Sequence, residues 1–156
     1  MATIFSHGIV AIALGRCLGY SSSWWKLWVW SVLCSILPDV DVISFAIGIP
    51  YEHVWGHRGI THSLFFAVLL SLIVVIGVFR HVPVGSGNWW KLCVYFFLVT
   101  ASHGVLDAMT NGGLGVAFFA PFDQTRYFFP WTPIEVSPIG LNGFVSARGV
   151  QVIVSE

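Results

Sequence analysis

Four apolar segments, separated by short polar stretches, divide the first two thirds of the chain. They cover Ile4–Leu18, Trp24–Leu37, Ile60–Phe79 and Trp89–Leu106. A helix needs about 20 apolar residues to cross a hydrocarbon core of about 30 Å, and Ile60–Phe79 offers the cleanest run. The pattern predicts an all-α, polytopic bundle of about four transmembrane helices.

Tryptophans and small residues in these segments indicate membrane interfaces and helix contacts. The pairs Trp24–Trp25 and Trp89–Trp90 are typical of anchors at a membrane interface. Ala11, Gly15 and Gly19 recur every four residues in the first segment, and this spacing favours close contact between helices.

Residues 110–156 have a different pattern, with several prolines, a Gly112–Gly113 pair and no apolar run of spanning length. We expect a loop-rich extension over one membrane face, following a transmembrane domain of residues 1–109. The final stretch, Gly149–Glu156, is compatible with a short strand or with the start of a helix.

Composition supports a membrane protein. Charged residues make up 9% of the 156-residue chain and hydrophobic residues 56%, with mean hydropathy +0.82, whereas soluble domains carry about 25% charged residues. The formal net charge of zero implies no nucleic-acid partner. The three cysteines lie in apolar stretches without CxxC spacing and are expected to be buried hydrophobes: Cys17, Cys34 and Cys93.

Seven ionisable side chains stand at the ends of the apolar segments. If the segments alternate in direction, all seven reach the same membrane face. Carboxylates and imidazoles near lipid are costly, so we expect them to bind a cation. They are His7, Asp39, Asp41, His57, His62, His103 and Asp107.

The spacing of these residues favours a metal site. His103 and Asp107 lie one helical turn apart on the same face. Asp39 and Asp41 follow Pro38, where a helix is expected to break. Two carboxylates so close repel each other unless a cation or a proton separates them. We expect both to be metal ligands, with Asp41 also a candidate general base.

The two central histidines, five residues apart, fit best with His57 in a loop and His62 on the first helical turn. Imidazole and carboxylate ligands suit zinc, with manganese as the alternative. Seven ligands exceed the three that one catalytic zinc usually takes, so one or two ions are expected. Two-metal sites are typical of phosphoester hydrolysis.

Three further side chains are candidate substrate contacts. Arg58 and Arg126 can each hold a phosphate by paired hydrogen bonds, and Arg58 can also stabilise charge that develops on a phosphoryl group. Thr61 is the third candidate. The alternative for Arg58 and Arg126 is contact with lipid headgroups.

Other interpretations stay open for the same residues. His103 and Asp107 can form a hydrogen-bonded pair between helices, and Asp39 and Asp41 can be solvated turn residues. His53 and His81 are expected to be packing or interfacial residues, and Asp123 and Glu135 polar loop residues.

Basic residues predict the orientation. Short cytoplasmic loops are enriched in lysine and arginine. The side away from the candidate site carries one basic residue more than the site side, which favours a site facing the periplasm. The far side has Arg16, Lys26, Arg80 and Lys91, and the site side Arg58, Arg126 and Arg148.

Three motifs in this order resemble the YdjM family. They are Leu37-Pro-Asp-Val-Asp41, His57-Arg-Gly-Ile-Thr-His-Ser63, and His103-x3-Asp107 followed by Thr110-Asn-Gly-Gly113. The resemblance extends from His7 to Trp131-Thr-Pro133, with His53 outside the pattern. It implies an inner-membrane, metal-dependent hydrolase, and the family description also implies LexA binding. Family members usually continue into a further apolar helix, so the chain is expected to stop short of one.

The ligand order is also similar to that of zinc-dependent phospholipase C and related single-strand nucleases. Those enzymes have an early His, an Asp, a further His and an HxxxD pair, which correspond here to His7, Asp39 or Asp41, His62, and His103 with Asp107. Their later HxxxE pair has no counterpart here, and Glu156 is the remaining late carboxylate candidate.

Together these observations predict a membrane-embedded, metal-dependent hydrolase of phosphoesters at the outer interface. A membrane lipid is the expected substrate, because the site lies at headgroup depth and the segment Phe118–Trp131 is rich in aromatic residues. An ion or proton transporter is a second class, although its ligands would lie at the midplane. A non-catalytic regulatory binding protein is a third. The pattern predicts no particular oligomeric state.

Overall fold

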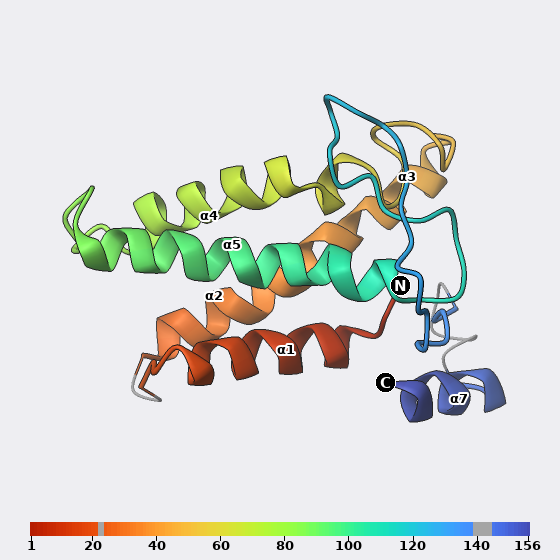
Figure 1. The fold of residues 1–156 in the computed structure, drawn as a ribbon, viewed down its shortest axis with the longest axis horizontal. Helices are drawn as coiled ribbons and strands as arrows, with labels where there is room; N and C mark the ends of the chain where they lie inside the picture. Colours follow the sequence, from red (N-terminus) through yellow and green to blue (C-terminus); the bar gives the residue numbers. More distant parts are fainter. Residues whose placement is uncertain (22–23, 139–144) are drawn as a thin grey trace.

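The computed structural model describes residues 1–21, 24–138 and 145–156. Four helices run side by side in alternating directions (Figure 1), and α5 contacts each of the other three. Within the described residues there are no strands, only two isolated bridges, which confirms the all-α prediction. The four helices are α1 (Ile4–Cys17), α2 (Trp25–Ile36), α4 (Leu64–Val78) and α5 (Gly87–Ala108).

Two helical stretches among the described residues are long and apolar enough to cross a membrane. One is α5, and the other is Trp25–Ala46, in which α2 continues through the 3₁₀ turn η1 (Leu37–Val42) into α3 (Ile43–Ala46). Helices α1 and α4 are apolar but have only 14 and 15 residues, about 21 to 23 Å of helix at 1.5 Å per residue.

The predicted segment Ile60–Phe79 is not one continuous helix. Ile60–His62 forms a separate 3₁₀ turn, η2, and Ser63 is extended with φ −80° and ψ 155°. The Ser63 hydroxyl then accepts the Phe66 N–H at 3.1 Å and caps α4. His62 therefore lies in the turn before the helix and not on its first turn.

Pro38 ends the α-helix without interrupting the helical path. Helix α2 stops at Ile36, and Pro38 occupies the first positions of η1, where its missing N–H leaves no hydrogen bond unmade. The expected helix break is thus a change from α to 3₁₀ geometry. This tighter turn carries both Asp39 and Asp41.

The apolar core surrounds the middle of α5. Tyr95 is fully buried there, and its hydroxyl contacts Ser31 Oγ at 2.6 Å and donates to the Ala11 carbonyl at 3.2 Å. Gly15 faces Trp28 and Tyr95 so closely that a Cβ would lie 2.6 Å from the Trp28 ring. The predicted close helix contact is confirmed at Ala11 and Gly15.

Several smaller expectations need correction. Gly19 lies past the end of α1 with φ +78° and open space around it, so it belongs to the turn and not to a helix contact. Trp89 packs into the core with 6% of its surface exposed, unlike Trp24, Trp25 and Trp90. Cys17 is exposed, whereas the other two cysteines are buried.

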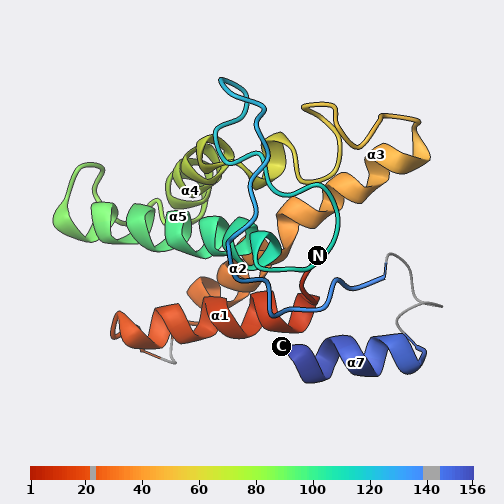
Figure 2. The same ribbon diagram turned by 45° about the vertical axis from the view of Figure 1, so that its right-hand side comes forward.

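Residues 110–138 return over the end of the bundle at which η1, η2 and the C-terminal end of α5 meet (Figure 1). The Phe129 N–H donates to the Ala108 carbonyl at 2.9 Å, which ties this segment to the end of α5. The last stretch forms a helix, α7 (Ala147–Ser155), which lies near the N-terminal end of α1 in both views (Figures 1 and 2).

Candidate metal centre

Two overlapping groups of histidines and aspartates lie at the end of the bundle covered by residues 110–138. The first combines one residue from η1, one from η2 and two from α5, all buried, with ligand atoms within 4.8 Å of one another: Asp39, His62, His103 and Asp107. The second consists of Asp41, His57 and His62. His62 belongs to both groups and therefore links them.

In the first group, nitrogen and oxygen atoms converge on one point. The Nε2 atoms of His62 and His103 are 3.0 Å apart. Oδ1 of Asp39 lies 3.3 Å from His103 Nε2, and Oδ2 of Asp107 lies 3.4 Å from His62 Nε2. Four donor atoms of this kind, at this separation, can surround a single small cation.

The orientation of His103 is set from behind. Its Nδ1 lies 2.6 Å from the Ser35 carbonyl oxygen, which can only accept, so Nδ1 carries the proton and donates. The Nε2 lone pair then faces the other three residues. Metal-binding histidines are commonly oriented by such a contact on the second ring nitrogen.

Asp41 plays the corresponding part for His62. Its Oδ2 lies 3.1 Å from His62 Nδ1 and also accepts the Thr61 hydroxyl at 2.5 Å and the Arg58 N–H at 3.1 Å. Its Oδ1 contacts His57 Nδ1 at 2.6 Å. Asp41 therefore connects His57 to His62, and His62 Nε2 points into the first group.

His7 lies beside the first group rather than within it. Its ring stacks on His103 with centroids 3.8 Å apart and planes 16° apart. His7 Nε2 is 3.7 Å from Asp107 Oδ1. The Ala2 N–H donates to this same oxygen at 2.7 Å, so the segment before α1 also contacts the centre.

Unsatisfied polar atoms at this point favour a bound cation. Both carboxylate oxygens of Asp39 and both ring nitrogens of His7 are buried without a hydrogen-bond partner among the described residues. A buried carboxylate without compensation is costly. Three neighbouring imidazole and carboxylate groups supply the ligand types that zinc and manganese accept, so the donor set fits a divalent metal.

Arg58 is fully buried, contrary to the alternative in which it faces headgroups. Its Nε donates to Asp107 Oδ2 at 3.0 Å, Nη1 to the Gly112 carbonyl at 2.8 Å and Nη2 to Thr110 Oγ1 at 2.9 Å. Its φ of 60° is in the left-handed region. The guanidinium therefore holds Asp107 against the turn that follows α5.

Arg126 contacts backbone carbonyls instead of headgroups. Its Nη1 donates to the His57 carbonyl at 3.0 Å and its Nη2 to the Tyr51 carbonyl at 2.8 Å, with the guanidinium over the Tyr51 ring. It thus fixes the loop that carries His57. In this structure the three proposed substrate contacts Arg58, Thr61 and Arg126 all bind groups that shape the centre, and substrate binding by them stays a prediction.

The structure adds residues that the motifs did not single out as functional. Ser35 orients His103 through a backbone carbonyl, for which the sequence offers no signal. Thr110 and Gly112 bind Arg58. The sequence signal for these two residues is their place in the motif Thr110-Asn-Gly-Gly113 directly after Asp107. Glu156, the late carboxylate candidate, instead accepts hydrogen bonds from Thr3 and from Ser6 Oγ, the latter at 2.6 Å.

Without metal, the electrostatics of His62 are dominated by its neighbours. Burial alone lowers the pKa of the imidazole, but hydrogen bonds to Asp107, Asp39 and Asp41 together hold that pKa well above its ordinary value. The carboxylates therefore favour a cation at this position, whether a proton or a metal ion.

Comparison with known proteins identifies the family to which this chain belongs. The family model described as "YdjM inner membrane protein" matches residues 1–155. The chain belongs to the YdjM family. It is 37% identical over 156 residues to the inner membrane protein YbcI of Escherichia coli (strain K12), covering all of this chain and 88% of YbcI. No solved structure matches the chain.

Family membership confirms the resemblance drawn from the three motifs. Every residue of those motifs that bears an imidazole or carboxylate belongs to one of the two groups at the centre. His53 is exposed and accepts the Trp55 N–H at 3.2 Å, and His81 lies beyond the far end of α4. Both histidines are outside the centre, as expected.

Proposed function

We propose that this YdjM-family protein is a membrane-embedded, metal-dependent hydrolase of phosphoesters. The observation that carries the proposal is Asp39. Its buried carboxylate has no hydrogen-bond partner among the described residues, yet it lies within ligand distance of His62 and His103. A divalent cation is the group that such an arrangement accommodates.

Asp39, His62, His103 and Asp107 would hold the metal, with His7 adjacent. Zinc is the favoured metal and manganese the alternative. We favour one ion over two because a second ion would need His62 Nδ1 as a ligand, and this atom already contacts Asp41. When bound, such a cation polarises a phosphoryl oxygen and makes water a stronger nucleophile near neutral pH.

Asp41 and His57 are the candidates for proton transfer. Their side chains are 2.6 Å apart, almost fully covered and next to the metal ligands. A carboxylate paired with an imidazole is suited to accept a proton from an attacking water. Arg58 supports the reaction by holding Asp107 in place, and its positive charge lies against this candidate metal ligand, 3.0 Å from Asp107 Oδ2.

A lipid substrate is favoured by an apolar groove beside the centre. The groove has a volume of about 440 Å³ and is lined by side chains of α4, α5 and residues 118–122. It includes Leu64, two residues after His62, and the Leu64 N–H donates to the Phe118 carbonyl at 2.9 Å. An acyl chain in this groove would lie beside the start of α4, two residues after the candidate ligand His62.

In the membrane we propose four spanning helices, with the centre facing the periplasm. Of the two shorter helices, α1 packs against both α2 and α5, and α4 packs against α5. A centre at one end of the bundle, instead of at its middle, argues against an ion or proton transporter.

The decisive experiment compares metal content and hydrolysis in detergent-purified protein. We expect about one equivalent of zinc or manganese in the wild type and turnover of a lipid phosphoester. Asp39→Asn should lose both, because an amide is a poor metal ligand. Asp123→Asn, the same substitution on an exposed loop aspartate, should lose neither. Folded wild-type protein that binds no divalent metal would contradict the proposal.

A further inference from the structure

Charge is divided unevenly between the two ends of the bundle. The end away from the metal centre has four basic residues, at the end of α1, the start of α2, just after α4 and near the start of α5: Arg16, Lys26, Arg80 and Lys91. All seven acidic residues lie elsewhere, in η1, in the loop between α3 and η2, in the last turn of α5 and in the segments that follow it: Asp39, Asp41, Glu52, Asp107, Asp123, Glu135 and Glu156.

These four cations have no acidic neighbour. Among the described residues, none of them lies within 4.0 Å of a carboxylate, whereas Arg58 and Arg148 both do. Lys26 instead lies over the Trp25 ring at 5.8 Å, and Arg16 over the Trp28 ring at 5.1 Å. The far end therefore presents positive charge on an aromatic surface, with no counter-ion from the protein.

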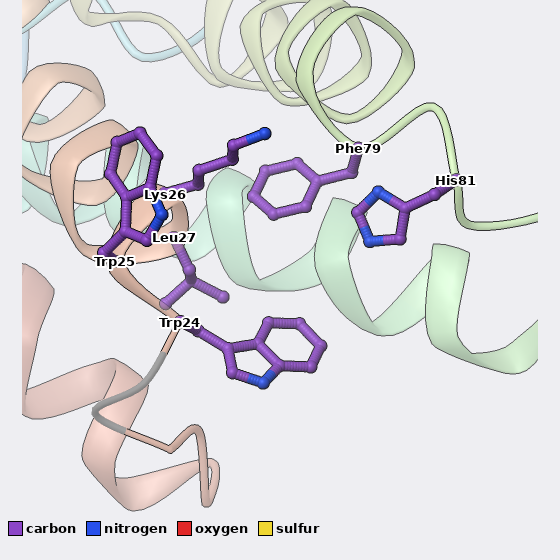
Figure 3. A pocket seen from close by; sticks show the side chains of 6 residues that line it. All are labelled: Trp24, Trp25, Lys26, Leu27, Phe79 and His81. Atoms are coloured by element: carbon purple, nitrogen blue, oxygen red, sulfur yellow. The ribbon is translucent and has the colours of Figure 1, made fainter.

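A cavity of about 210 Å³ opens in this surface between the start of α2 and the end of α4 (Figure 3). Its walls combine aromatic rings with a lysine and a histidine: Trp24, Trp25, Lys26, Leu27, Phe79 and His81. Lys26 reaches it from the start of α2 and His81 from the turn after α4 (Figure 3).

A second cavity adjoins the first. It has a volume of about 430 Å³ and shares Trp24 and His81 with the first cavity. Its remaining polar lining includes Tyr20, Asn88 and Lys91. The two cavities thus extend around Trp24 and His81, with Lys26 on one side and Lys91 on the other.

We propose that this paired cavity binds the phosphate headgroup of an anionic phospholipid. The lysines supply charge for a phosphate, Asn88 and His81 supply hydrogen bonds, and the Trp and Phe rings cover the adjoining glycerol and acyl carbons. Basic pockets between membrane helices bind anionic headgroups in this way, and tryptophans prefer the same depth. This site is separate from the metal centre and does not depend on hydrolysis.

Native mass spectrometry of the detergent-purified full chain tests the proposal. The protein is mixed with phosphatidylglycerol or, separately, with phosphatidylcholine. We expect one phosphatidylglycerol to be retained per chain and phosphatidylcholine to be bound at least tenfold more weakly. Equal retention of the two lipids would overturn the proposal. Displacement of phosphatidylglycerol by inorganic phosphate at similar concentration would overturn it too, because the cavity would then recognise free phosphate.

The matched variants remove charge at one end or at the other. Lys26→Gln combined with Lys91→Gln should weaken retention of phosphatidylglycerol roughly thirtyfold, from the contribution of each basic residue near an anionic headgroup. Arg148→Gln, on α7 and outside both cavities, should leave it unchanged. An unchanged affinity in the double variant, or an equal loss in Arg148→Gln, would contradict the assignment. Metal content should be the same in all three proteins.

Discussion

Asp41 lies 3.1 Å from Nδ1 of His62, on the side of the imidazole ring opposite the candidate metal centre. This contact makes Asp41 the partner that orients His62, because the other ring nitrogen is 3.0 Å from His103. The two aspartates of one 3₁₀ turn therefore have different positions. Asp39 faces the centre itself, and Asp41 supports one of its ligands from behind.

Replacing Asp41 should weaken metal binding without removing a ligand of the first group. We expect Asp41→Asn to lower metal affinity about 10- to 100-fold, as is typical when the partner of a metal-binding histidine is changed. Competition with a chelator of known affinity measures the change. Asp39→Asn should lose binding altogether, and equal effects of the two substitutions would argue against their different roles.

Metal affinity should rise with pH. The neighbouring carboxylates hold the pKa of His62 well above its usual value in the metal-free protein, despite burial. His62 is thus protonated near neutral pH, and a metal ion must displace that proton. We expect a roughly tenfold gain in affinity per pH unit until the pKa of His62 is passed. Calorimetry in buffers of different ionisation enthalpy should show about one proton released.

Loss of the Arg58–Asp107 ion pair should strongly destabilise the fold. Both side chains are fully buried, and removing one partner of such a pair leaves an uncompensated charge, which costs about 3–5 kcal/mol. We expect Arg58→Gln to lower the free energy of unfolding of the metal-free protein by that amount. Thermal unfolding in detergent provides the measurement.

A control for Arg58 exists in the same chain. Arg148 pairs with Glu135 at 2.7 Å, but both side chains are substantially exposed, and exposed pairs contribute about 0–1 kcal/mol. Arg148→Gln should therefore change stability little. A comparable loss in the two variants would show that burial does not set the strength of the Arg58 contact.

Gly15 should tolerate no side chain. A Cβ there would lie 2.6 Å from the Trp28 ring and 2.8 Å from the Tyr95 hydroxyl, so Gly15→Ala should cost about 1–3 kcal/mol through overpacking. Gly8 lies on the same helix with no atom within 4 Å of an added Cβ. Gly8→Ala should stabilise the protein by about 0.5–1 kcal/mol. Both changes are read from unfolding midpoints in detergent.

Much of the architecture follows from the sequence alone. Apolar runs predict helices because backbone groups in lipid must be paired within one segment. The alternation of those runs brings His7, Asp39, His62, His103 and Asp107 to one end of a bundle, and the structure places them there. The charge pattern and the three motifs were equally visible without coordinates.

Only the tertiary structure decides which atom faces which. Arg58 stands between His57 and His62 in sequence, but with a left-handed backbone at this residue its side chain extends to the turn after α5. Asp39 and Asp41 are two residues apart in the same motif. Only the geometry of the 3₁₀ turn η1 shows that Asp39 faces His103 while Asp41 contacts the other side of the His62 ring. The reason is physical: helical periodicity is a local property of the chain, whereas the direction of a side chain in a turn depends on contacts with residues far away in sequence.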